Sequence, residues 1–157
     1  MLALLAALAL SLPTQGTPGA VLYCPDGIYT LPGPLPLKVF KKGRLLKLAL
    51  PYRRPDWRLT VRYRFVRAEI VREVLKKPRP FPKTQIALVR ICMKGPQGWS
   101  CVERPKKDLK THWDEKSRTL WIFLEQRGPL EAVEVRLIFG EGECGGYLLY
   151  EKDGLPY

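Results

Sequence analysis

Arginine side chains spaced two residues apart are the feature of this sequence with the clearest chemistry. From 57 to 67 the chain reads W-R-L-T-V-R-Y-R-F-V-R, so apolar residues alternate with Arg58, Thr60, Arg62 and Arg64. A period of two is typical of a β-strand with one buried and one solvated face. Alternate residues on a strand lie about 6.6 to 7 Å apart, close to the spacing of phosphates along a nucleic-acid strand. The pattern therefore indicates a row of guanidinium groups suited to binding a polyanion.

The basic, Pro-rich segment after this strand extends the candidate site. Cationic side chains continue through 76–83, and two aromatic residues on expected loops are of the type that stacks on bases or sugar rings. The candidate set for polyanion binding is Arg58, Arg62, Arg64, Arg67, Lys76, Lys77, Arg79, Lys83, Phe81 and Trp99. The alternative is that the arginines form weak, exposed ion pairs with glutamates of a neighbouring strand, such as Glu131 or Glu134.

Catalytic residue types are sparse. His112 is the only histidine, and Asp114 and Glu115 beside it would allow acid–base chemistry. Ser100 and Ser117, the serines outside the N-terminal segment, lie in no nucleophile-elbow pattern. We therefore expect a protein that is not an enzyme, with no catalytic residue, no cofactor and no metal site. A hydrolase that uses His112 is the least favoured alternative.

The N-terminal segment is expected to be a secretory leader. Residues 2–12 are apolar except for Ser11, a run too short to span a bilayer, which takes about 20 residues. Such a run matches the apolar region of a leader, and Gly16 provides a small residue near the usual cleavage position. No Lys or Arg precedes the run, so a buried N-terminal strand or helix is the alternative. We expect a leader over 1–20, one β domain over 21–157 and no transmembrane span in the mature chain.

Four cysteines behind a leader predict two disulfides in an oxidising compartment. Cys92 and Cys101 flank a Gly/Pro loop and would join the two arms of a hairpin, which leaves Cys24 and Cys144 to connect the ends of the domain. Three connectivities are possible in principle. A zinc site is the alternative, but the chain has no C-x-x-C pair and one histidine.

Short apolar runs separated by turn residues predict an all-β fold. The expected strands cover 21–23, 28–31, 37–41, 44–50, 57–66, 85–94, 101–104, 119–125, 132–139 and 147–150. The prolines of 32–36 are expected to prevent regular structure, 105–117 to be a charged connection and 140–146 to be a turn. Residues 67–77 fit either a continued strand or a single helix. About 8 to 10 short strands indicate an antiparallel β-sandwich or small barrel.

Charge is unevenly distributed along the chain, whose net charge is +12. Residues 21–110 carry 22 Lys and Arg against 6 Asp and Glu, whereas 111–157 carry 5 against 9. A basic side favours an acidic protein or a polyanionic polymer as partner, with nucleic acid among the candidates. The absence of asparagine and the 15 prolines are typical of heat-adapted proteins.

These observations predict an exported, non-catalytic binding or structural component of the cell envelope or of an extracellular appendage. The alternative is a polyanion-binding module at the cell surface or in an uptake machine. Under either function, the expected location of the protein is periplasmic, cell-surface or extracellular. Such a domain could also form oligomers through unpaired edge strands.

Overall fold

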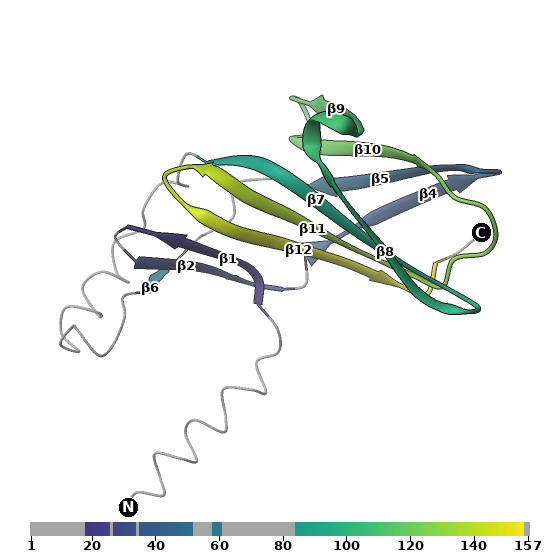
Figure 1. Cartoon of the computed structure of the whole chain (residues 1–157), viewed down its shortest axis with the longest axis horizontal. Helices are drawn as coiled ribbons and strands as arrows, with labels where there is room; N and C mark the ends of the chain where they lie inside the picture. Colours follow the sequence, from purple (N-terminus) through teal and green to yellow (C-terminus); the bar gives the residue numbers. More distant parts are fainter. Residues whose placement is uncertain (1–17, 26, 34, 52–57, 61–83, 156–157) are drawn as a thin grey trace, which may run out of the picture.

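The computed structural model describes residues 18–25, 27–33, 35–51, 58–60 and 84–155. Within those residues the chain forms twelve strands in two sheets, which is an all-β fold with more strands than the sequence predicts (Figure 1). In chain order they are β1 (Pro18–Cys24), β2 (Gly27–Pro32), β3 (Leu35–Pro36), β4 (Lys38–Lys42), β5 (Leu45–Pro51), β6 (Arg58–Thr60), β7 (Thr84–Gly95), β8 (Gly98–Pro105), β9 (Lys110–Asp114), β10 (Thr119–Glu125), β11 (Ala132–Gly142) and β12 (Gly145–Asp153). A short 3₁₀ helix, η3 (Lys106–Asp108), lies between β8 and β9.

The large sheet has the strand order β6-β2-β1-β12-β11-β7-β8, and β3 pairs with β12 outside this path. Its pairs are antiparallel except for β3 with β12, which is parallel. The small sheet has the order β4-β5-β10-β9 and is antiparallel throughout. No strand pairing joins the two sheets in the described part of the chain. The architecture is therefore a two-layered sandwich.

One hydrophobic core fills the space between the sheets. On β5 the inward residues are Leu46, Leu48 and Leu50, and on β10 they are Leu120 and Ile122, so both strands bury every second side chain. The large sheet faces them with Ala20, Leu22, Tyr29, Leu31, Val89, Ile91, Val133, Val135, Leu137, Phe139, Leu148 and Tyr150. Alternation thus fixes which face of each strand is left for solvent or for a ligand.

A buried tyrosine also joins the two layers. Tyr150 of β12 is fully buried, and its hydroxyl donates a hydrogen bond of 3.2 Å to the carbonyl oxygen of Pro51 on β5. This hydrogen bond joins the large sheet to the small sheet and gives the buried phenol hydroxyl a partner in place of water.

Two disulfides stabilise this fold, with the connectivity that the sequence favours. Cys92 and Cys101 lie directly opposite each other on β7 and β8. Cys24 at the end of β1 is bonded to Cys144, in the turn before β12, across 120 residues of sequence. A protein with two structural disulfides is typical of an oxidising, extracellular environment.

Three expectations about irregular segments need correction. The prolines of 32–36 do not exclude strands: Pro32 is the last residue of β2, beyond the part that pairs with β6, and Pro36 lies in β3, which pairs only with β12 among the described residues. The segment 105–117 is more than a connection, since it contains η3 and β9. The turn expected over 140–146 is narrower, because β11 and β12 extend into it.

Other expectations fall outside the described residues. These are the strand-or-helix segment 67–77, the arginine strand beyond Thr60, and the leader up to residue 17. Strand β1 begins at Pro18, so its first three residues fall in the range assigned to the leader. No helix in the described ranges has the length and apolar composition needed to cross a membrane.

Candidate functional site

The basic set expected from the sequence falls largely outside the described residues. Arg62, Arg64, Arg67, Lys76, Lys77, Arg79, Phe81 and Lys83 lie there, so their common surface stays a prediction. Arg58 is in β6, where it pairs with Thr30 of β2. Trp99 is not on a loop: it lies on the edge strand β8 opposite Lys94, with 52% of its surface exposed. Glu134, an expected partner of the arginine row, lies 3.3 Å from Nε of Arg136.

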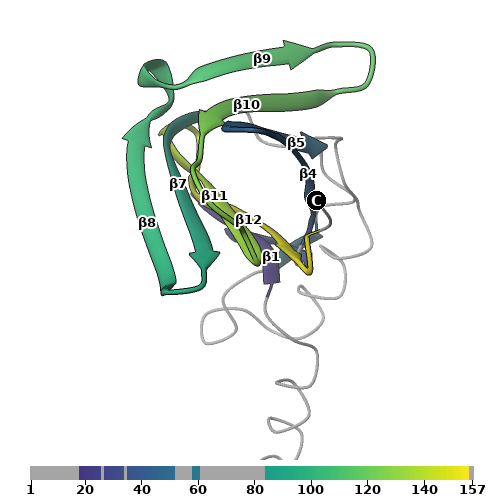
Figure 2. The same cartoon turned by 90° about the vertical axis from the view of Figure 1, so that its right-hand side faces the viewer.

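The outer face of the small sheet carries the densest combination of aromatic and cationic side chains in the described part of the chain. We call it the aromatic–lysine face, and its members are Lys38, Phe40, Lys42, Lys47, Lys110, His112, Trp121 and Phe123. On β5 and β10 they alternate with residues that point into the core. Figure 2 shows this sheet, formed by β4, β5, β10 and β9, as the layer that lies across the core from the large sheet.

Strand register orders the face into two rows that cross all four strands. One row runs Phe40, Lys47, Phe123, Lys110, and the neighbouring row runs Lys38, Ala49, Trp121, His112. Residues directly opposite on antiparallel strands have Cβ atoms about 4.5 to 5.5 Å apart. The first row therefore alternates aromatic and ammonium groups, and the second carries the indole at its centre.

Ala49 explains how the aromatic rings come together. It lies between Lys38 and Trp121 in the second row and is only 3% exposed although it faces away from the core. Its small side chain leaves room for the indole of Trp121 to lie toward Phe40, and the two ring centroids are 5.8 Å apart at an angle of 30°. Phe40 remains 51% exposed. Phe40 is thus open to solvent, whereas Trp121 is half-buried.

The lysines on the face are available to an anionic ligand. Lys38, Lys42, Lys47 and Lys110 are exposed, and none forms an ion pair with a residue in the described ranges. Lys110 holds its ammonium group 6.0 Å from the centroid of Phe123, which is within the range of a cation–π contact. Cations and rings thus occupy the same surface.

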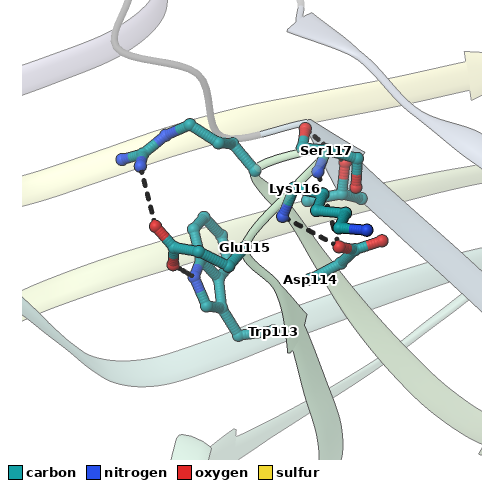
Figure 3. A network of polar contacts seen from close by, with 7 residues as sticks. Trp113, Asp114, Glu115, Lys116 and Ser117 are labelled. Atoms are coloured by element: carbon teal, nitrogen blue, oxygen red, sulfur yellow. Dashed lines mark hydrogen bonds and ion pairs between the residues drawn. The ribbon is translucent and has the colours of Figure 1, made fainter.

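His112 lies at the β9 end of this face, exposed and opposite Trp121. The acidic residue on the same side of β9, Asp114, stabilises the turn that follows, because its Oδ1 accepts hydrogen bonds from the backbone amides of Lys116 (3.1 Å) and Ser117 (3.4 Å) (Figure 3). A hydrogen bond with the Ser117 side chain is the main cause that holds the pKa of Asp114 below its ordinary value, and the two backbone amides lower this pKa further. In the described structure no hydrogen bond joins His112 to Asp114, Glu115 or Ser117.

Sequence reasoning missed this face, although part of its signal is present. The run 38–42, K-V-F-K-K, combines three cations with one aromatic residue. The run 119–125, T-L-W-I-F-L-E, is apolar on both faces, so Trp121 and Phe123 are indistinguishable from core residues by pattern alone. Only the pairing of β10 with β5 and β9 shows that these two rings face outward.

Comparison with protein-family models, with curated proteins and with solved structures finds no match to this chain. Among the described residues, no three His, Cys, Asp or Glu side chains gather as metal ligands would. The acidic residues Glu141 and Glu151 lie on different strands, Glu141 near the end of β11 and Glu151 near the end of β12.

Proposed function

We propose that this protein is an exported, non-catalytic binding domain that holds single-stranded nucleic acid on the aromatic–lysine face. The observation that carries the proposal is the row in which Phe40, Lys47, Phe123 and Lys110 alternate across four paired strands, beside the indole of Trp121. The exposed ring of Phe40 and the half-buried, outward-facing rings of Trp121 and Phe123 offer stacking surfaces to bases, and ammonium groups between them neutralise the backbone phosphates.

A single strand fits this surface better than a duplex. Trp121 and Phe123 are two residues apart on β10, so their Cα atoms are about 6.6 to 7 Å apart, a spacing that an extended strand with unstacked bases matches. Nucleic-acid modules built on a four-stranded sheet use exposed aromatic residues in this way, each stacking a base. The bases of a duplex are stacked on each other and are not accessible to such rings.

Two sequence features support export. The apolar run at 2–12 has the length of a leader's apolar region, and the two disulfides are stable in an oxidising compartment. The binding domain would then work in the periplasm, at the cell surface or outside the cell, for example in a machine that takes up nucleic acid. The basic segment 52–83, most of which lies outside the described residues, provides further cationic side chains for a polyanion.

A structural role in the envelope or an appendage is the second candidate, and edge strand β8 favours it. Seven of its eight residues are exposed, including Trp99 and Val102, and it ends the large sheet. Among the described residues β8 has a partner strand on one side only, and such an edge can accept a strand from another subunit through backbone hydrogen bonds. Polymer or oligomer formation by the purified protein would support this role.

The proposal is tested by equilibrium binding of three fluorescently labelled probes to the purified protein. They are an oligothymidylate of about ten nucleotides, a duplex of the same length, and heparin, an anionic polymer without bases. We expect the single strand to bind more tightly than the duplex. The double substitution Trp121→Leu with Phe123→Leu should weaken binding of the single strand about tenfold or more, because each stacked base contributes about 1 to 3 kcal/mol.

The matched control is Tyr23→Leu, which removes a ring that is 54% exposed on the large sheet and should leave binding unchanged. Thermal unfolding of each variant, followed by circular dichroism, checks that the sheets remain folded. If heparin binds as tightly as the oligonucleotide and neither affinity depends on Trp121, the face is a charge-only surface and the nucleic-acid proposal is wrong.

A further inference from the structure

A pocket opens between the two sheets on the opposite side of β9 and β10 from the aromatic–lysine face. Its volume is about 370 Å³, within the range of small-molecule sites. It is lined by Thr84, Gln85, Ile86, Lys106, Trp113, Arg118, Leu120 and Phe139, which come from β7, η3, β9, the turn after β9, β10 and β11. Neither the rings nor the lysines of the aromatic–lysine face contribute to it.

The floor of the pocket is apolar. Leu120 and Phe139 are each 3% exposed and belong to the core, so the pocket reaches the interior of the sandwich. Ile86 packs against the same core, and Trp113 forms a wall that is 37% exposed. An apolar or aromatic group placed here would bury its surface against these four side chains.

The rim of the pocket carries two cationic side chains, one of which, Arg118, forms an ion pair with Glu115. Lys106 comes from η3 and Arg118 from the turn between β9 and β10, so two separate elements bring positive charge to one opening. The guanidinium carbon of Arg118 lies 5.7 Å from the ring centroid of Trp113. Glu115 holds the side chains of Arg118 and Trp113 in place. Its Oε1 is 3.3 Å from Nη1 of Arg118, and its Oε2 accepts a hydrogen bond of 2.6 Å from the Trp113 indole (Figure 3).

The backbone at Arg118 is an independent sign that its side chain is used. Its φ of +51° lies in the left-handed region, and among the described residues no other non-glycine side chain has a positive φ. Glycine adopts this conformation without steric cost, whereas arginine adopts it at a steric cost because of its Cβ atom. Residues with such strained backbone angles cluster at functional sites, including those that hold a ligand. A turn that required only closure would be served better by glycine.

We propose that this pocket binds a small amphipathic anion: an apolar or aromatic body that enters between the sheets, with a carboxylate, sulfonate or phosphate held by Arg118 and Lys106. The site is separate from the aromatic–lysine face and does not depend on nucleic-acid binding. Guanidinium and ammonium groups form charge-assisted hydrogen bonds with such head groups, and the apolar floor discriminates against inorganic anions.

The test uses a matched pair of fluorescent probes on the full-length protein. Anilinonaphthalene sulfonate carries the anionic head group, and N-phenylnaphthylamine has a similar aromatic body without it. We expect saturable binding of one sulfonate per chain, with an emission increase, and weaker binding of the neutral probe. Arg118→Gln and Lys106→Gln should each lower the affinity for the sulfonate about tenfold or more and leave that for the neutral probe unchanged.

Arg127→Gln is the charge control, because Arg127 is exposed in the loop after β10 and does not line the pocket. Arg118→Gly separates a binding role from a structural one: it relieves the backbone strain and should keep the thermal midpoint while losing affinity for the sulfonate. Non-saturable binding, equal affinity for both probes, or the same loss in Arg127→Gln as in Arg118→Gln would overturn the proposal.

Discussion

Salt dependence gives a quantitative test of the lysines on the aromatic–lysine face. When a lysine neutralises one phosphate of a single strand, it contributes about −0.7 to the slope of log affinity against log salt concentration. Lys38, Lys42, Lys47 and Lys110 are all exposed there. If each contacts one phosphate, the slope is about −2.8, which is about a fifty-fold loss of affinity between 50 and 200 mM salt. Cations outside the face would make the total slope steeper.

The change in slope on substitution is therefore the sharper quantity. Lys47→Gln combined with Lys110→Gln removes the two ammonium groups that alternate with Phe40 and Phe123. This variant should reduce the magnitude of the slope by about 1.4, whatever the contribution of other cations. The assay is fluorescence anisotropy of a labelled oligothymidylate at four or more salt concentrations, at constant pH.

Lys152→Gln provides the control, since Lys152 is exposed on β12 of the large sheet and should leave the slope unchanged. An unaltered slope in the double variant, with measurable binding, would refute the assignment of these lysines to phosphate contacts. An equal decrease in Lys152→Gln would indicate a diffuse effect of net charge.

Three further predictions concern stability. Burial, together with Glu134 directly opposite on β11, raises the pKa of Glu151, so its ionised form is unfavourable in the folded state. Glu151→Gln should therefore raise the free energy of unfolding by about 0.2 to 1 kcal/mol at pH 7, a gain that disappears below about pH 4, where the carboxyl is protonated in both states. Tyr150→Phe removes the hydrogen bond to Pro51 and should lower the free energy of unfolding by about 1 kcal/mol, measured by urea denaturation. Loss of the Cys24–Cys144 bond should cost about 5 kcal/mol and loss of Cys92–Cys101 about 3 kcal/mol, because the first closes the longer loop.

Each of these has a contrary outcome. A gain for Glu151→Gln that persists in acid would show that the carboxylate charge is not its origin. An unchanged denaturation midpoint for Tyr150→Phe would mean that the phenol is satisfied equally well by other partners. If removal of Cys92–Cys101 were the more costly change, restriction of the unfolded chain would not explain the stabilisation.

Local pattern predicts the elements whose partners are near in sequence. The run 119–125 forms β10 with the expected bounds, and Gly43 and Arg44 separate β4 from β5 as a hairpin turn does. The hairpin at Cys92 and Cys101 likewise follows from the Gly/Pro loop between them. In each case the turn residues and the alternation act within a dozen residues, which is the range over which sequence pattern is informative.

The two sites depend on contacts that pattern does not encode. Strand β9 has the sequence K-T-H-W-D, whose single apolar residue gives no alternation, so its pattern predicts a connection rather than a strand. Its pairing with β10 places His112 on the outer face and turns Trp113 toward the pocket. The pocket also needs Thr84 and Phe139, which lie far apart in sequence and meet only when β7 pairs with β11.

The most direct measurement is a nuclear magnetic resonance titration of the labelled protein with an oligothymidylate. The account predicts that backbone and indole signals shift on β4, β5, β10 and β9, with the indole of Trp121 among the largest changes, and that β8 and β12 stay unaffected. Shifts confined to the large sheet, or a Trp121 signal that does not move at saturation, would contradict the claim that this protein binds single strands on the aromatic–lysine face.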